Sequence, residues 1–279
     1  MLTSAQQAQY QRDGYLVLPG FKGAAEIAAL RARAEEIVEQ FEPSARPAIF
    51  TTREQETSTD DYFLASDKTV RCFFEEEAFA QDGSLKQAKA LSINKIGHAM
   101  HDLDPVFRAF SSDPKLAAVA RDLGLTDARV WQSMYIFKQP GIGGEVRWHQ
   151  DATYFDTAPI SVTTFWFALE DATQDNGCLW AEPGGHRGPL RERFVRDGAK
   201  VAIERLDATP WPDDRSAVAL EVKAGSLVCF HGLLPHYSAP NRSPVSRHAY
   251  TLHATDAASA YSARNWIQRD AAFPARGFV

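Results

Sequence analysis

Val130-Trp-Gln-Ser-Met-Tyr-Ile-Phe137 opens a run of short segments rich in β-branched and aromatic residues, the side chains that fit a pleated sheet best. Turn-forming clusters such as Pro140-Gly-Ile-Gly-Gly144 and Asp175-Asn-Gly177 separate these segments. The other segments that we expect to be strands are 146–149, 162–169, 178–181, 220–222, 227–231 and 247–254. Many short strands joined by tight turns predict a sandwich or a double-sheet barrel.

The residues before this run have a helical pattern. From about Ala24, apolar residues recur at steps of three and four, which places them on one face of a helix. Asp113 and Pro114 start a shorter helix that Gly124 ends. We therefore expect one domain over residues 1–279, with a helical region at about 1–125 packed on a β core at about 128–255. The stretches 42–61 and 191–214 lack periodicity and are expected to be long loops that act as lids or binding loops.

Composition excludes several classes of protein. The net charge is −6, and no run of Lys or Arg is long enough to bind nucleic acid. No apolar run approaches the ~20 residues of a membrane helix, and the N-terminus lacks a secretory signal, so we expect a cytoplasmic protein without a membrane partner. Cys72, Cys178 and Cys229 share no CxxC spacing, which indicates free structural thiols. A small-molecule substrate is the expected partner, and a monomer is the default.

Two histidines and an aspartate form the candidate metal site. His149 and Asp151 end one expected strand, where residues two apart point to the same face. His236 follows another expected strand, 85 residues after Asp151. A His-x-Asp triplet alone is common by chance, and its alternative is a surface pair. With the second imidazole the set suits iron(II), because it leaves three open positions for a bidentate 2-oxo acid and dioxygen, whereas zinc prefers a closed tetrahedron or a single water site.

A 2-oxo acid co-substrate also needs a cation for its distal carboxylate, and the planar fork of arginine binds a carboxylate through two hydrogen bonds. Arg247 begins the expected strand after His236 and is our candidate, with a surface ion pair as the alternative. His231 and His253 also fall on expected strands. We expect them to be core or supporting histidines rather than a fourth ligand.

The chain resembles the phytanoyl-CoA dioxygenase family over nearly its whole length. The similar stretches are 61–64, 92–99, 132–140, 143–146, 149–152, 170–173, 176–180 and 225–228, of which Gln132–Pro140 and Asn176–Trp180 are the most specific. The resemblance implies a mainly β fold with flanking α-helices around a double-stranded β-helix, which is a jelly-roll or cupin-like core. It also implies iron(II), 2-oxoglutarate and dioxygen as cofactor and co-substrates, with His149, Asp151 and His236 as the iron ligands.

The resemblance extends to the residues that would hold 2-oxoglutarate. Arg247 and Ser238 match the positions that bind its distal carboxylate. Lys95, Met134 and Trp166 match positions that line the pocket, and Gln132 is a weaker candidate nearby.

The reaction that the resemblance implies is hydroxylation of a C–H bond in a small molecule or acyl substrate, with release of succinate and carbon dioxide. Related halogenases replace the carboxylate of the metal site by a small residue, so Asp151 argues against halogenation. Desaturation, epimerisation and ring closure stay open, because the same oxidant serves them all.

Two other functions remain as alternatives: a zinc or manganese hydrolase, and a jelly-roll protein that binds or senses a metal without turnover. An acyl-CoA substrate would need several basic groups at the mouth of the barrel. The order of residues leaves open whether Arg53, Arg71, Arg147 and Arg187 gather there.

Overall fold

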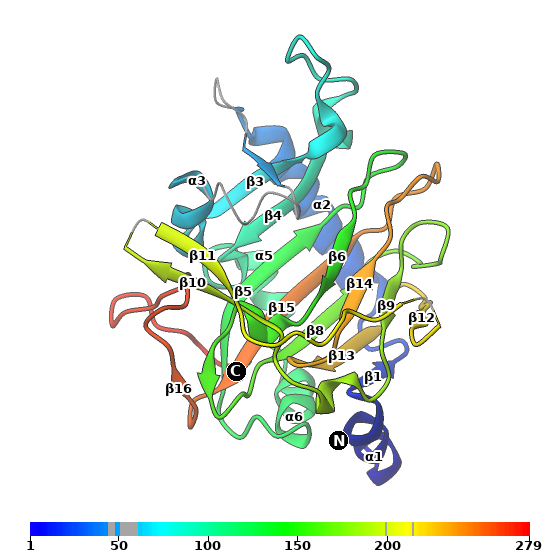
Figure 1. Cartoon of the computed structure of the whole chain (residues 1–279). Coiled ribbons are helices and arrows are strands. Elements are labelled where there is room, and N and C mark those ends of the chain that lie inside the picture. The colour runs from blue at the N-terminus through cyan, green and yellow to red at the C-terminus, as the bar shows by residue number, and fades with distance from the viewer. Residues whose placement is uncertain (44–47, 51–60, 199, 214) are drawn as a thin grey trace.

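The computed structural model of the chain describes all residues except 44–47, 51–60, 199 and 214 (Figure 1). Most of the expected loop at 42–61, including Arg53, therefore lies outside the described residues. In the part that is described, two β-sheets face each other and helices cover the outer side of the larger one (Figure 1). The fold is mainly β with flanking helices, as the sequence predicts.

The larger sheet has eight strands in the order β1-β13-β8-β15-β5-β4-β3-β2. Its strands are β1 (Tyr15–Leu18), β2 (Ile49–Phe50), β3 (Val70–Glu75), β4 (Ile93–His98), β5 (Ala128–Ile136), β8 (Thr163–Ala168), β13 (Leu227–His231) and β15 (Ala249–Asp256). Only β2 and β3 pair in parallel, and all other neighbours in this sheet are antiparallel. The smaller sheet runs β12-β9-β14-β6, with β6 (Val146–His149), β9 (Leu179–Ala181), β12 (Val218–Leu220) and β14 (His236–Ser238).

Six α-helices flank the sheets among the described residues. They are α1 (Ser4–Asp13), α2 (Ala24–Gln40), α3 (Asp61–Leu64), α4 (Met100–Leu103), α5 (Pro105–Ser111) and α6 (Pro114–Asp122). Figure 1 shows α2 and α5 on the side of the larger sheet that faces away from β6 and β14. Their apolar faces pack there on alternate residues of the sheet, for example Leu30 and Phe107 in one cluster with Tyr135 and Tyr250.

The two helices that the sequence predicts are confirmed as α2 and α6. Ile27, Leu30 and the other apolar residues of α2 are buried on one face. The carboxylate of Asp113 accepts a hydrogen bond from the backbone N–H of Lys115 and so caps the start of α6. Gly124 follows that helix with a φ of +105°, a conformation that a residue with a Cβ adopts only under strain.

The first 125 residues are not only helical, because they also contribute β1, β2, β3 and β4 to the larger sheet. β3 and β4 are buried on both faces along most of their length, so their apolar residues do not alternate and the sequence lacks the usual strand pattern. Because this sheet takes strands from both parts of the chain, it supports the proposal of a single domain.

The expectation of an irregular loop at 191–214 is wrong for most of that stretch. β10 (Glu192–Asp197) and β11 (Lys200–Arg205) form an antiparallel hairpin in which Phe194 pairs with Ile203. The consecutive residues Phe194 and Val195 are both buried, so the apolar residues of β10 do not alternate with polar ones. Asp197-Gly198 at the turn is a strong hairpin signal that points to the correct structure.

The remaining elements are short. β7 (Thr157–Ala158) pairs with β16 (Ala260–Tyr261), and five 3-10 turns are described: η1 (Ala65–Lys68), η2 (Glu76–Ala78), η3 (Lys89–Leu91), η4 (Asp151–Thr153) and η5 (Gly185–Arg187). Within the described residues, every helix is too short or too polar to cross a bilayer.

Candidate active site

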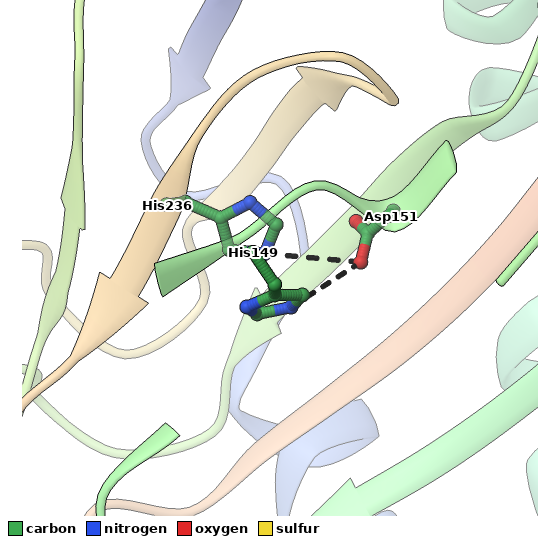
Figure 2. A group of neighbouring side chains, drawn as sticks. All are labelled: His149, Asp151 and His236. Atoms are coloured by element: carbon green, nitrogen blue, oxygen red, sulfur yellow. Dashed lines mark ion pairs between the residues drawn. The ribbon is translucent and has the colours of Figure 1, made fainter. Parts of the chain in front are cut away.

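His149, Asp151 and His236 meet at one point between the two sheets. His149 ends β6, Asp151 opens η4 immediately after it, and His236 starts β14. Because β14 pairs with β6, His236 lies opposite His149, and their ring centres are 4.1 Å apart. One oxygen of the carboxylate, Asp151 Oδ1, is 3.6 Å from His149 Nε2 and 3.8 Å from His236 Nε2 (Figure 2). These three atoms are close enough together to bind one ion.

Hydrogen bonds of the Nδ1 atoms of His149 and His236 determine the tautomer of each imidazole. His149 Nδ1 lies 2.8 Å from the carbonyl oxygen of Arg147, and His236 Nδ1 lies 3.0 Å from that of Leu234. A carbonyl oxygen can only accept, so each Nδ1 carries the proton and donates it. Each Nε2 is left with a free lone pair directed at the common point, which is the state that a metal ligand needs.

The surroundings of His236 and Asp151 favour the forms that can bind a metal, which are the neutral imidazole and the ionised carboxylate. Burial and, to a lesser extent, the neighbouring His149 lower the pKa of His236 to about 4. Burial by itself would raise the pKa of Asp151, but the neighbouring His236, His253 and His149 outweigh it and hold that pKa well below its usual range. The carboxylate is therefore ionised at neutral pH, while the His236 imidazole is neutral.

Arg247 lies deep in the same interior, two residues before β15, with only 1% of its surface exposed. Its Nε donates to the carbonyl oxygen of Gly177 at 3.0 Å, and its Nη2 donates to Ser238 Oγ at 3.2 Å. Nη1 is buried and has no hydrogen-bond partner among the described residues. A buried guanidinium nitrogen without a partner is costly, so this atom is suited to an anion that comes from outside the chain.

A cavity opens beside the metal-site residues and contains three of the pocket residues that the sequence predicts. It is lined by Phe63, Asn94, Lys95, His98, Gln132, Met134, Ile136, Lys138, Gly144, Val146, Arg147, His149, Asp151, Tyr154, Phe155, His253 and Trp266. Lys95, Gln132 and Met134 are among these residues, whereas Arg247, Ser238 and Trp166 lie outside this lining. Trp166 nevertheless faces the guanidinium of Arg247, whose carbon is 5.4 Å from the indole centre.

Lys95 is a buried cation in the wall of this cavity. Its Nζ lies 4.0 Å from Met134 Sδ and between 5 and 6 Å from the ring centres of Phe63 (5.7 Å) and Phe73 (5.6 Å). Burial lowers the pKa of Lys95 well below its usual value, because the apolar surroundings penalise the charged ammonium. An anionic co-substrate next to it would restore the charged form.

Three residues of the site were missed by the sequence reasoning. Thr164 Oγ1 donates to Asp151 Oδ2, and it could have been found because it lies two residues before Trp166 on the same face of β8. The carbonyl oxygen of Gly177 accepts from both Ser238 Oγ and Arg247 Nε. Lys138 Nζ donates to the carbonyl oxygens of Gly144 at 2.7 Å and Ser238 at 3.3 Å, so it ties β14 to the turn before β6.

The remaining histidines fall into two groups. His253 is buried in the cavity wall, where its Nε2 lies 3.6 Å from Asp151 Oδ1 and its ring stacks on Phe155. It supports the carboxylate but is not within reach of all three members of the metal cluster. His101 and His248 bond to side chains on the opposite face of β5, and His231 lies near His186 outside this cavity.

The basic residues considered for an acyl-CoA do not gather at the cavity. Of the three that the structure describes, only Arg147 lines it. Arg71 donates to the carbonyl oxygen of Tyr62, and Arg187 donates to that of Arg12.

The sequence of the chain matches known proteins over almost its whole length. The family model described as "Phytanoyl-CoA dioxygenase (PhyH)" matches residues 10–249. The chain is 47% identical over 269 residues to "Phytanoyl-CoA dioxygenase 1" of Oryza sativa subsp. japonica, an alignment that covers 96% of this chain and 94% of that protein. It is 44% identical over 276 residues to "Phytanoyl-CoA dioxygenase domain-containing protein 1" of Bos taurus, covering 96% and 95% of the two chains.

Solved structures share the fold at lower identity. The carbocyclase SnoK from nogalamycin biosynthesis, described as non-haem and α-ketoglutarate-dependent, matches with a TM-score of 0.67 and 21% identity, covering 99% of this chain and 96% of that one. The epimerase SnoN from the same biosynthesis, solved in complex with Fe³⁺, α-ketoglutarate and nogalamycin RO, matches with a TM-score of 0.62 and 20% identity, covering 92% and 84%. At these identities the likeness concerns the fold, which is the jelly-roll core that the sequence predicts.

Proposed function

Since the chain belongs to the phytanoyl-CoA dioxygenase family and is thereby an enzyme of the 2-oxoglutarate-dependent dioxygenase class, we propose that it hydroxylates a C–H bond of a small molecule or acyl substrate. In this proposal His149, Asp151 and His236 bind iron(II), and 2-oxoglutarate and dioxygen are the co-substrates. The observation that carries it is the meeting of two free imidazole lone pairs and one carboxylate oxygen beside a buried arginine with an unpaired nitrogen.

The residues present fit this metal and this co-substrate. Two neutral imidazoles and one carboxylate grouped at one point are the donor set of non-haem iron(II) oxygenases, since they leave positions for other ligands. Arg247 would hold the distal carboxylate of 2-oxoglutarate through Nη1, with Ser238 beside it. When bound, the iron supplies the redox chemistry that couples conversion of 2-oxoglutarate to succinate and carbon dioxide with oxidation of the substrate.

The protein's own part in the reaction is to position groups and to exclude water. The carbonyl oxygens of Arg147 and Leu234 keep both ligand imidazoles in the tautomer that exposes Nε2. Thr164 holds Asp151 Oδ2 and so turns Oδ1 toward the metal position. Apolar side chains of the cavity wall, among them Phe155 and Trp266, surround the space where a substrate C–H bond would lie.

Production of succinate separates this proposal from its rivals. With iron(II), dioxygen and 2-oxoglutarate, the purified protein is expected to release succinate, and a zinc or manganese hydrolase or a binding protein would not. His149→Ala, Asp151→Ala and His236→Ala are each expected to abolish both iron binding and succinate release. His231→Ala is the matched control, because that histidine lies outside the cavity. Succinate release that persists in all three site variants would refute the proposal.

A further inference from the structure

His98 is a histidine in the cavity wall for which the proposed chemistry has no use. It ends β4, it is 0% exposed, and it lines the same cavity as His149 and Asp151. Its Nε2 is buried and has no hydrogen-bond partner among the described residues. A buried polar atom left without a partner destabilises the folded protein, so its presence in a cavity wall points to a partner that enters the cavity.

The hydrogen bonds of Ser66 determine which nitrogen of His98 carries the proton. Ser66 Oγ lies 2.5 Å from the carbonyl oxygen of Phe63, and a carbonyl oxygen can only accept, so the single hydroxyl proton of Ser66 points there. Ser66 Oγ also lies 2.6 Å from His98 Nδ1. Because that hydroxyl has no second proton to give, His98 Nδ1 must carry a proton and donate it to Ser66. In the neutral ring Nε2 is then a bare acceptor.

The surroundings keep the ring neutral and fixed in place. Burial lowers the pKa of His98 well below its usual value, and the nearby Lys95 and His253 lower it further. The rings of Phe63, Phe73 and Trp266 pack against the imidazole, with centres 5.4, 5.5 and 5.1 Å from that of His98. The acceptor therefore cannot rotate toward water or toward another protein group without breaking this packing.

We propose that His98 determines substrate specificity, with its Nε2 accepting a hydrogen bond from a hydroxyl or N–H group on an otherwise apolar part of the substrate. This inference rests on the proposed function, since it concerns the substrate of the same cavity. Phe63 and Trp266, which stack on each other with ring centres 4.6 Å apart, both line the cavity beside His98, so the portion of the substrate that carries the donor meets aromatic surface. Such a portion is a ring or a branched hydrocarbon with one alcohol, phenol or N–H group.

The first test measures the tautomer in the native protein. Two-bond ¹H–¹⁵N correlation spectra distinguish protonated from bare ring nitrogens, and the signals of His98 are those that disappear in His98→Phe. The expected result is a protonated Nδ1 and a bare Nε2. A proton on Nε2, with or without one on Nδ1, would overturn the proposal. This measurement needs no metal, no co-substrate and no known substrate.

The second test compares two probes of nearly the same shape, indole, which has an N–H donor, and benzofuran, which has an acceptor oxygen in its place. Saturation-transfer NMR titrations on the metal-free protein are expected to show indole bound about fivefold more tightly, the gain from one neutral hydrogen bond. His98→Phe keeps a ring in the wall and is expected to remove the preference. His231→Phe, outside the cavity, is expected to retain it.

Equal affinities of the two probes for the wild-type protein, or a preference that survives in His98→Phe, would refute the role of His98. Both tests are independent of turnover, so a failure here is distinguishable from a failure of the proposed function. The latter would be seen as absence of succinate from a protein whose His98 is in the expected tautomer.

Discussion

Thr164 Oγ1 donates a hydrogen bond to Asp151 Oδ2 at a distance of 2.5 Å, across the interior from the larger sheet to the first residue of η4. The bond engages one carboxylate oxygen and leaves the other to face His149 and His236. A metal site depends on such supporting bonds because a ligand that rotates freely loses conformational entropy when it binds.

We therefore expect Thr164→Val to weaken metal binding by roughly 10- to 100-fold, while the protein stays folded. Thr255→Val is the matched control: its hydroxyl accepts a hydrogen bond from Trp131 Nε1, so the change costs stability but leaves the metal site intact. Titration of both variants with Mn²⁺, followed by electron paramagnetic resonance, measures the affinities. Equal affinity of Thr164→Val and wild type would show that the hydroxyl does not orient the carboxylate.

Arg247→Ala is expected to weaken 2-oxoglutarate binding by at least about 30-fold and to leave metal affinity within a few-fold of the wild type. The reason is that removing one partner of a buried charge pair costs about 2–5 kcal/mol. Arg247→Lys keeps the charge but lacks the planar fork, so we expect a loss between those of wild type and Arg247→Ala. Calorimetric titration with 2-oxoglutarate in the presence of Mn²⁺ measures both. Unchanged affinity in Arg247→Ala would show that another residue holds the distal carboxylate.

Gly177→Ala is expected to weaken 2-oxoglutarate binding by displacing the backbone carbonyl group that orients Arg247 and Ser238. Gly177 has a φ of +83°, and an added Cβ would lie 2.6 Å from Lys138 Cε and 2.7 Å from the carbonyl oxygen of Ala239. The shift that relieves these contacts moves the carbonyl oxygen that orients Arg247 and Ser238. We expect a loss of about 1–3 kcal/mol in the free energy of unfolding together with weaker 2-oxoglutarate binding.

Gly124→Ala is the control for backbone strain alone. Gly124 has a φ of +105°, and nothing lies within 4 Å of an added Cβ. Both variants should therefore lose stability in urea titrations, but only Gly177→Ala should lose affinity for 2-oxoglutarate. Equal affinities in the two variants would contradict the role of the Gly177 carbonyl.

The three cysteines are free and buried, as the sequence predicts. Burial raises the pKa of Cys72 to about 12 and that of Cys178 to about 11, and it raises the pKa of Cys229 as well. Thiolate is the reactive form, so the native protein should not react with a thiol reagent such as DTNB at pH 8, whereas the urea-unfolded protein should release three equivalents. Rapid modification of the native protein would show that one thiol is accessible.

Stability should fall as the solution is acidified. Burial lowers the pKa of His231 and of His248 to about 4 in the folded state, whereas an unfolded histidine titrates near pH ~6.5. Between these pH values the unfolded state binds more protons, so the free energy of unfolding decreases from about pH 6.5 down to about pH 4. Urea unfolding in the presence of EDTA at several pH values measures this slope. His231→Gln should reduce the slope by up to one proton, and an unchanged slope would contradict the shift.

The sequence predicts those strands in which apolar and polar residues alternate, and it predicts the three residues that meet at the candidate metal site. His149 and Asp151 could be placed because a strand directs residues two apart to one face, and His236 because it follows a second strand. The structure brings these three side chains together. Among the strands that the sequence did not predict, β3 and β4 are buried on both faces along most of their length and so have no alternation to detect.

Other parts of the site depend on contacts between distant segments. The spacing of Thr164 and Trp166 places the threonine on the face of the site, but its hydrogen bond to Asp151 is apparent only when β8 and η4 are placed side by side. The acceptor role of His98 depends on a proton of Ser66, 32 residues earlier, and on the carbonyl oxygen of Phe63. Neither relationship leaves a local pattern in the sequence.

The pairing of β1 with β13, Tyr15 opposite Phe230, has a consequence for biosynthesis. Translation delivers the edge strand β1 of the larger sheet long before its neighbour β13, with His236 and Arg247 following later still. A nascent chain on the ribosome thus cannot complete this sheet, or bring the three proposed metal ligands together, before residue 236 has emerged.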